Sequence, residues 1–98
     1  MKSLVFSAKA RVDLVAIADF IAAEDPMRAS RFVAALRERC VSLTLHPFQG
    51  HPAPEIDAQA RLLLFRSYVV LHRVVDERID IIRVLHGAQD RSLLTLDP

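Results

Sequence analysis

The residues of this chain best suited to chemistry are its arginines. Lys2 and Lys9 are the only lysines among 13 basic residues, which leaves 11 arginines. Four of these lie in or beside the apolar second half of the chain: Arg61, Arg66, Arg73 and Arg83. A guanidinium recognises carboxylates and phosphates through a planar fork of N–H donors, and an unpaired charge is costly to bury. Each partner is therefore either an acid of the chain itself, such as Glu55, Asp57 or Asp90, or a bound molecule. Both interpretations stay open.

Four histidines and one cysteine are the candidates for metal binding or proton transfer: His46, His51, His72, His86 and Cys40. Their spacing fits no zinc signature, so we expect no metal and no cofactor. His72 and His86 fall on successive strand-like runs, where they could face each other and transfer a proton near neutral pH. The alternative, which we favour, is that each histidine hydrogen-bonds a backbone group at the sheet edge.

Length and composition predict one small domain. The chain has 98 residues, 52% of them hydrophobic, and a formal net charge of +1. The apolar content argues against disorder, and the near-neutral charge argues against a general nucleic-acid binder. A single cysteine, with no signal peptide and no long apolar span, favours a cytoplasmic protein that does not enter membranes. Because so small a core is thin, a partner that covers apolar surface would add stability.

The first half of the chain predicts a short strand followed by two helices. Leu4–Phe6 reads as the strand, and Ser7 is placed to cap a helix that begins at Ala8. The expected inward positions of this helix are Val12, Val15 together with Leu14, Ala18, Ile21 and Ala22. Asp25-Pro26 ends it and opens a second helix, which His46-Pro47 terminates. The inward stripe of the second helix is Ala29, Phe32, Val33, Leu36, Cys40 and Leu43.

The second half predicts a loop and three strands. Residues 47–55 hold three prolines and one glycine, which is typical of a loop. The β-rich runs are Ala60–Phe65, Tyr68–Val75 and Ile79–His86, joined by connections short enough to require antiparallel hairpins. Strict alternation would place Arg83 on one face with Ile79, Ile81 and Leu85, and His86 on the other with Ile82 and Val84. The order β-α-α-β-β-β predicts an α+β fold with the helical hairpin on one face of a small antiparallel sheet.

Three motifs, in the same order as these elements, resemble the RelE/ParE toxin family of type II toxin–antitoxin systems, and ParE most closely. They are "AKARVDLVAIADFIAAEDPMRASRFVAAL", "HPFQG" and "RSYVVLHRVVDERIDIIRVLHGAQD". The resemblance covers about residues 4 to 90 and implies one toxin domain over residues 1–98. Its core would span about residues 3–90, with residues 91–98 as a tail.

The resemblance to ParE implies a toxin that binds DNA gyrase and stalls replication until an antitoxin neutralises it. RelE-like relatives instead cut messenger RNA on the ribosome, with lysines, arginines and a late tyrosine or acid. This chain has no lysine after Lys9 and no aromatic residue after Tyr68, which favours a non-enzymatic toxin and ranks the endoribonuclease second. His72 and Gln89 depart from the family pattern, so a relative without toxicity is the third reading.

By the same resemblance, antitoxin or target binding is expected at the end of the chain and along the three strands. No catalytic residue and no sequence-specific DNA contact by the toxin alone is implied. Asp90 and Arg91 are expected to close the exit turn, and Leu93, Leu94 and Leu96 to pack or to dock a partner. The candidate binding residues are Arg61, Arg66, Tyr68, His72, Arg73, Arg83, His86, Asp90 and Arg91.

Overall fold

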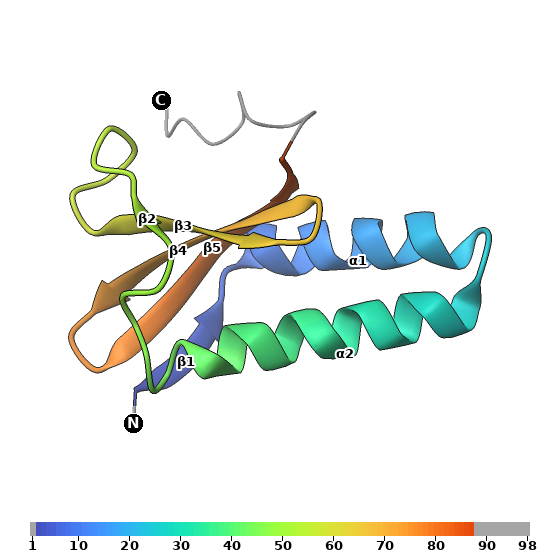
Figure 1. Cartoon of the computed structure of the whole chain (residues 1–98), viewed down its shortest axis with the longest axis horizontal. Helices are drawn as coiled ribbons and strands as arrows, with labels where there is room; N and C mark the ends of the chain where they lie inside the picture. The colour runs from blue at the N-terminus through green and yellow to red at the C-terminus, as the bar shows by residue number, and fades with distance from the viewer. Residues whose placement is uncertain (1, 88–98) are drawn as a thin grey trace.

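Two antiparallel helices cover one face of a five-stranded sheet, as Figure 1 shows. The computed structural model describes residues 2–87. Within these residues, neither helix is long and apolar enough to cross a membrane. The elements are β1 (Ser3–Phe6), α1 (Ala8–Ala22), α2 (Pro26–Ser42), β2 (His51–Pro52), β3 (Ala60–Phe65), β4 (Tyr68–Val75) and β5 (Arg78–His86).

The sheet has the order β1-β5-β4-β3-β2. Strands β3, β4 and β5 form the predicted antiparallel meander. Its two turns place Arg66 and Asp76 at φ values of 55° and 54°, the left-handed conformation that tight hairpins favour. The fold class and the helical hairpin on one face are therefore confirmed.

Two details of the sheet differ from the prediction. β1 pairs with β5 in parallel, so the sheet is mixed rather than purely antiparallel. Short turns determine the direction of consecutive strands only, and β1 is separated from the meander by both helices. The second difference is β2, two residues of the predicted loop that pair with β3.

The helix boundaries follow from the predicted caps. The Ser7 hydroxyl accepts a hydrogen bond from the Ala10 amide at 3.0 Å. The Asp25 carboxylate accepts one from the Arg28 amide at 3.1 Å, and Pro26 occupies the first turn of α2, where no amide hydrogen bond is lost. These caps satisfy amides that would otherwise have no partner at the start of each helix.

The main core lies between the helices and the sheet, and α2 contributes the predicted stripe of buried Ala29, Phe32, Leu36 and Cys40. The predicted inward face of α1 is correct at Ile21 and Ala22 but wrong at Val12 and Val15. Its buried residues are Ala10, Ile17 and Ile21, whereas Val12 and Val15 are 67% and 61% exposed. Because α1 carries small or apolar residues around most of its circumference, periodicity did not single out one face.

A smaller core lies on the opposite face of the sheet. The segment around Ala53 and Ile56 packs there on Ala60, Val69, Leu71 and Leu85. The register shifts between Leu71 and His72, so Ile81 and Val84 both join the helix-side core. Ile82 and Leu85 join the smaller core instead. Relative to Ile79 and Ile81, the predicted alternation along β5 is therefore wrong for Val84 and Leu85, because a β-bulge interrupts the two-residue period.

Candidate functional site

Arg83, one of the predicted binding residues, joins β5 to α1. Its Nε and Nη2 donate to the two carboxylate oxygens of Asp13 at 2.8 and 2.9 Å. The Val84 amide donates to the same carboxylate at 2.9 Å. Both side chains of the ion pair are largely buried, at 20% and 11% exposure. A bidentate pair in such surroundings fixes the geometry of two elements, so Arg83 holds the helix on the sheet.

Arg73 lies among carboxylates of the chain itself. It contacts Asp57 at 3.1 Å and Asp80 at 3.4 Å, and Arg78 donates to Asp80 at 2.6 Å. The hydrogen bond from Arg78 holds the pKa of Asp80 below its ordinary value, with a further lowering from Arg73. This network connects β4, β5 and the segment before β3.

Arg61 and His72 hold the loop that follows α2. The Arg61 guanidinium donates to the carbonyls of Gln49 and Gly50 at 3.3 and 2.9 Å. His72 is fully buried, and its Nε2 lies 3.2 Å from the Gln49 carbonyl, which matches the favoured backbone role. Burial lowers the pKa of His72, and its Nδ1 has no hydrogen-bond partner within residues 2–87.

The less favoured alternative, in which His72 and His86 face each other, is wrong. His86 lies opposite Tyr68, with ring centroids 5.3 Å apart, and His72 lies opposite Ile81. The two histidines lie on the neighbouring strands β4 and β5 but at different register positions, because the residue opposite His86 is Tyr68, four residues before His72. A two-histidine proton-transfer site is therefore excluded by the register.

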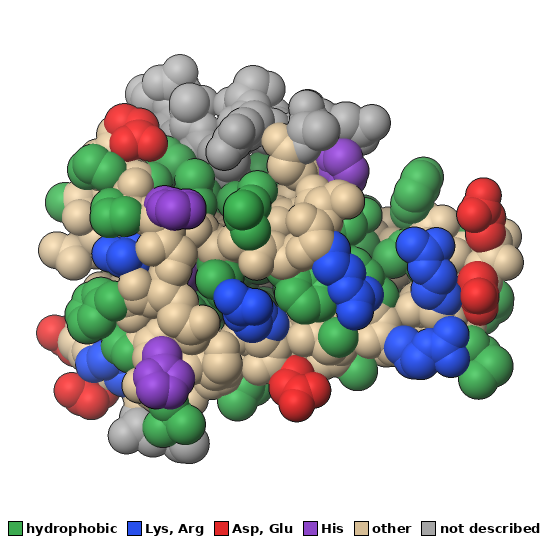
Figure 2. All heavy atoms as spheres, viewed as in Figure 1, with side chains coloured by type: hydrophobic (Ala, Val, Ile, Leu, Met, Phe, Trp, Pro, Cys, Tyr) green, Lys and Arg blue, Asp and Glu red, His purple; other side chains and the backbone are tan. Residues whose placement is uncertain are grey.

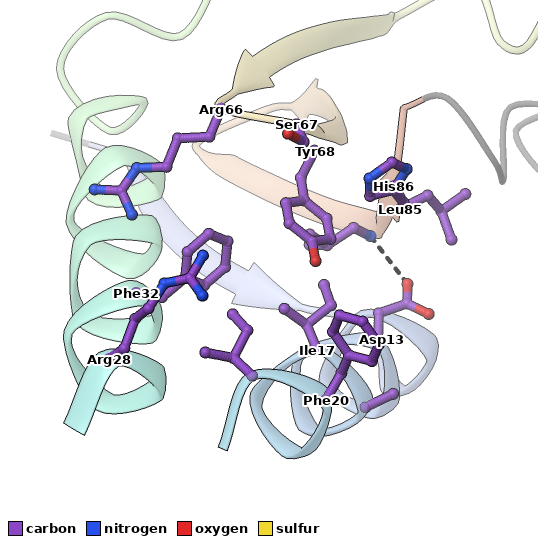
Figure 3. Close-up of a pocket in the computed structure, with 13 residues that line it drawn as sticks. Asp13, Ile17, Phe20, Arg28, Phe32, Arg66, Ser67, Tyr68, Leu85 and His86 are labelled. Carbon is purple, nitrogen blue, oxygen red and sulfur yellow. Dashed lines mark hydrogen bonds between the residues drawn. The ribbon is translucent and has the colours of Figure 1, made fainter. Parts of the chain in front are cut away.

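A pocket of about 530 Å³ opens between α1, the first turn of α2, the β3–β4 turn and the end of β5. Figure 3 shows its residues. Apolar side chains form much of its wall, and Asp13 is the one carboxylate that lines it. Because Asp13 is already bound by Arg83 and the Val84 amide, this carboxylate is occupied. The lining residues are Asp13, Ala16, Ile17, Phe20, Ile21, Arg28, Phe32, Arg66, Ser67, Tyr68, Val84, Leu85 and His86.

The structure brings Arg66, Tyr68 and His86 together in this pocket. The Arg66 guanidinium lies over the rings of Phe32 and Phe65, at 5.5 and 5.0 Å from their centroids. Figure 3 shows the Tyr68 hydroxyl directed toward α1. The pocket thus combines guanidinium groups, a phenol and an imidazole with an apolar wall.

Arg28 and Phe20 belong to the pocket but were absent from the sequence-based candidates. Arg28 lies in the first turn of α2, and Figure 3 shows its side chain on the same side of the pocket as that of Arg66. Phe20 is 76% exposed on α1. Phe20 was outside the predicted inward positions of α1, but its sequence position alone did not place it beside the β3–β4 turn and the end of β5.

Arg61, Arg73 and Arg83 are not part of the lining, so three of the four arginine candidates serve contacts within the chain. Asp90 and Arg91, with the predicted exit turn and the leucines of the tail, lie outside the described residues. Among residues 2–87, no group of three or more histidine, cysteine, aspartate or glutamate side chains is placed to hold a metal.

Charged and apolar side chains are mixed on the face seen in Figure 2. Basic side chains lie over its helical half with hydrophobic side chains between them. Large apolar side chains exposed on α1 and at the start of α2 include Val12, Val15, Phe20 and Met27. A surface with this mixture is typical of protein recognition rather than of a continuous phosphate-binding groove.

Residues 4–91 match the model of a family described as the ParE toxin of type II toxin–antitoxin systems, parDE. The chain belongs to this ParE toxin family, and it is a type II toxin.

Two similar proteins agree with this assignment. Toxin RelE2 of Caulobacter vibrioides is 30% identical over 89 residues, which cover 91% of this chain and 99% of that protein. A structure described as the chromosomal ParDE toxin–antitoxin system from P. aeruginosa is also 30% identical, with a TM-score of 0.75. The match covers 88% of this chain and 96% of that chain.

Proposed function

We propose that this toxin, acting as a single domain over residues 1–98 in the cytoplasm, inhibits DNA gyrase and thereby blocks replication. A cognate antitoxin would neutralise it by binding its exposed surface. The observation that carries the proposal is the match of residues 4–91 to the ParE toxin family. The scarcity of lysine, with Lys2 and Lys9 alone, agrees with an activity based on binding rather than on cleavage of a phosphodiester.

The test is a supercoiling assay with purified gyrase and relaxed plasmid. We expect the toxin to inhibit supercoiling or to trap cleaved DNA at concentrations near that of gyrase, and an added antitoxin to restore activity. The protein encoded beside the toxin gene is the candidate antitoxin. If supercoiling proceeds unchanged at a large molar excess of toxin, the gyrase part of the proposal fails.

Messenger RNA cleavage is the second candidate function, and one observation favours it. Tyr68 and His86 lie 5.3 Å apart between ring centroids in a pocket that also contains Arg66, so proton-transfer groups adjoin a cation. A general acid and base with a neighbouring guanidinium are elements of metal-independent RNA cleavage. The similarity to a toxin named RelE2 points the same way. Primer extension after induction distinguishes the two functions, since only the endoribonuclease leaves codon-phased cuts.

A further inference from the structure

We propose that the sheet face opposite the helices docks the chain's own tail, residues 88–98, through Leu93, Leu94 and Leu96. The tail lies outside the described residues. Its docking surface is an uncharged apolar strip along β3, β4 and β5. A partner that uses the same face would first have to displace the tail. This inference does not depend on whether gyrase is the target.

The apolar strip lies on the side of the sheet that carries the smaller core. Leu64 on β3 is directly opposite Val69 on β4, and Val69 is directly opposite Leu85 on β5. Residues opposite each other on neighbouring strands share a face, so Leu64 continues the smaller core. Leu64 is nevertheless 59% exposed, and Leu62 and Ile82, which pack on the same core, are only partly buried. The strip therefore offers apolar surface that a further segment can cover.

The described chain ends beside this strip. The Gly87 amide donates to the Ser67 carbonyl at 2.9 Å, and a Cβ at Gly87 would lie 3.2 Å from Cγ2 of Val69. Leu64 is two strands away from β5, or about 10 Å at the usual strand spacing. Leu93 follows Gly87 by six residues, which can span about 20 Å. The tail leucines are therefore within reach of the strip.

The composition of the tail matches the strip. Residues 92–96 read Ser-Leu-Leu-Thr-Leu and contain no charged side chain. Farther along the same face, Arg73 lies opposite Ala60 of the smaller core, and it contacts Asp80 at 3.4 Å. The strip therefore favours an uncharged segment, because a charge placed on it would lose water without gaining a partner. Covering apolar surface is favourable by about 25 cal/mol per Å².

Attachment to the same chain favours the tail over a separate molecule. A tethered segment acts at an effective concentration in about the millimolar range, so it occupies the strip before a free segment of similar affinity does. The match to the toxin family ends at residue 91, before the three leucines of the tail. The docking is therefore inferred for this chain rather than for its family.

Trypsin tests the docking on the unmodified toxin, because it cleaves after Arg91, directly before the leucine-rich residues. Mass spectrometry measures the rate at which residues 92–98 are released, and a synthetic peptide of residues 86–98 gives the reference rate. We expect the folded toxin to be cut at Arg91 at least about tenfold more slowly than the peptide, since cleavage requires the docked segment to open. Equal rates in the toxin and the peptide would overturn the inference.

Leu64→Ser tests whether the strip is the docking surface. This substitution should raise the rate of cleavage at Arg91 by at least about threefold, because it removes apolar surface from the strip. Val12→Ser is the matched control, since Val12 is 67% exposed on α1, and it should leave the rate unchanged. Circular dichroism and thermal melting establish that both variants are folded. Equal protection in Leu64→Ser and in wild type would show that the tail binds elsewhere.

Dilution distinguishes docking within one chain from docking on a second copy. Protection within one chain is the same at every toxin concentration, and protection that disappears on dilution would contradict the proposal. Thermal melting provides an independent check. Leu94→Ser should lower the melting temperature of the wild type but not that of the Leu64→Ser variant, because both substitutions disrupt the same contact. An equal decrease in both backgrounds would show that Leu94 and Leu64 do not interact.

Discussion

Five arginines of this toxin fall into two groups that differ in their contacts. Arg61, Arg73 and Arg83 contact carbonyls and carboxylates of the chain itself and join separate elements of the fold. Arg28 and Arg66 lie at the mouth of an apolar pocket and form no ion pair within residues 2–87. The first group stabilises the fold, whereas the second has no carboxylate partner in that part of the chain. Residue type alone does not distinguish them, because the difference lies in which carboxylates the fold places nearby.

The largest effect on stability is expected from Asp13→Asn. This change removes the partner of a largely buried Arg83 and weakens the bond to the Val84 amide. Breaking one side of such a pair costs about 3 kcal/mol. Urea unfolding measures the loss, and Asp19→Asn on the exposed side of α1 is the control, with a change within about 0.5 kcal/mol. A small effect of Asp13→Asn would show that the ion pair between Arg83 and Asp13 does not stabilise the fold.

Gly50→Ala should destabilise the loop held by Arg61 by about 2 kcal/mol. Gly50 has a φ of 88°, and an added Cβ would collide with the backbone carbonyl of Leu62. Gly87→Ala is the comparison, since its Cβ would meet the Val69 side chain at 3.2 Å, which can move more easily. Thermal unfolding of the two variants checks the order. Equal melting temperatures would show that the loop is not restrained as described.

The contrast between the two arginine groups is tested by Arg73→Ala and Arg66→Ala. Arg73 is 38% exposed and has two carboxylate partners, so its removal should cost about 1 kcal/mol. Arg66→Ala should change the free energy of unfolding by less than about 0.5 kcal/mol, because Arg66 is exposed and has no carboxylate partner within residues 2–87. If Arg66→Ala were more destabilising than Arg73→Ala, the two groups of arginines would not differ in their contribution to stability.

The buried His72 should make the free energy of unfolding depend on pH. Burial lowers its folded-state pKa below 6.5, so the unfolded chain binds the proton more tightly. The contribution of His72 to stability is therefore complete above the unfolded pKa and declines as the pH falls below it, with a slope under about 1.4 kcal/mol per pH unit. His72→Gln should flatten the stability curve between pH 7 and 5 relative to wild type. His51→Gln, at an exposed position, should leave it unchanged.

Much of the fold was predictable because its signals are local. Ser7, Asp25 and Pro26 mark the helix ends, and short polar pairs mark the hairpins of β3 to β5. The direction of β1 depends on a pairing across more than 70 residues, for which the sequence has no local signal. The bulge near Leu71 likewise breaks a period that looks regular in the sequence.

The site was predicted only in part. Arg66, Tyr68 and His86 were chosen for their place on the meander, and they do meet in the pocket. Arg28 and Phe20 were missed because they lie on different helices, and only the folded arrangement brings them to the same pocket as the β3–β4 turn. The pairing of Arg83 with Asp13 joins residues 70 positions apart and needed the folded arrangement.

The difference between the two groups of arginines is tested most directly by isothermal titration calorimetry, which measures the affinity of the toxin for the protein encoded beside its gene. We predict that Arg28→Glu/Arg66→Glu weakens this binding by at least about tenfold, while Arg11→Glu/Arg39→Glu stays within about threefold of wild type. Affinity that is equal in both variants would contradict the account, because the pocket arginines would then contribute nothing to recognition.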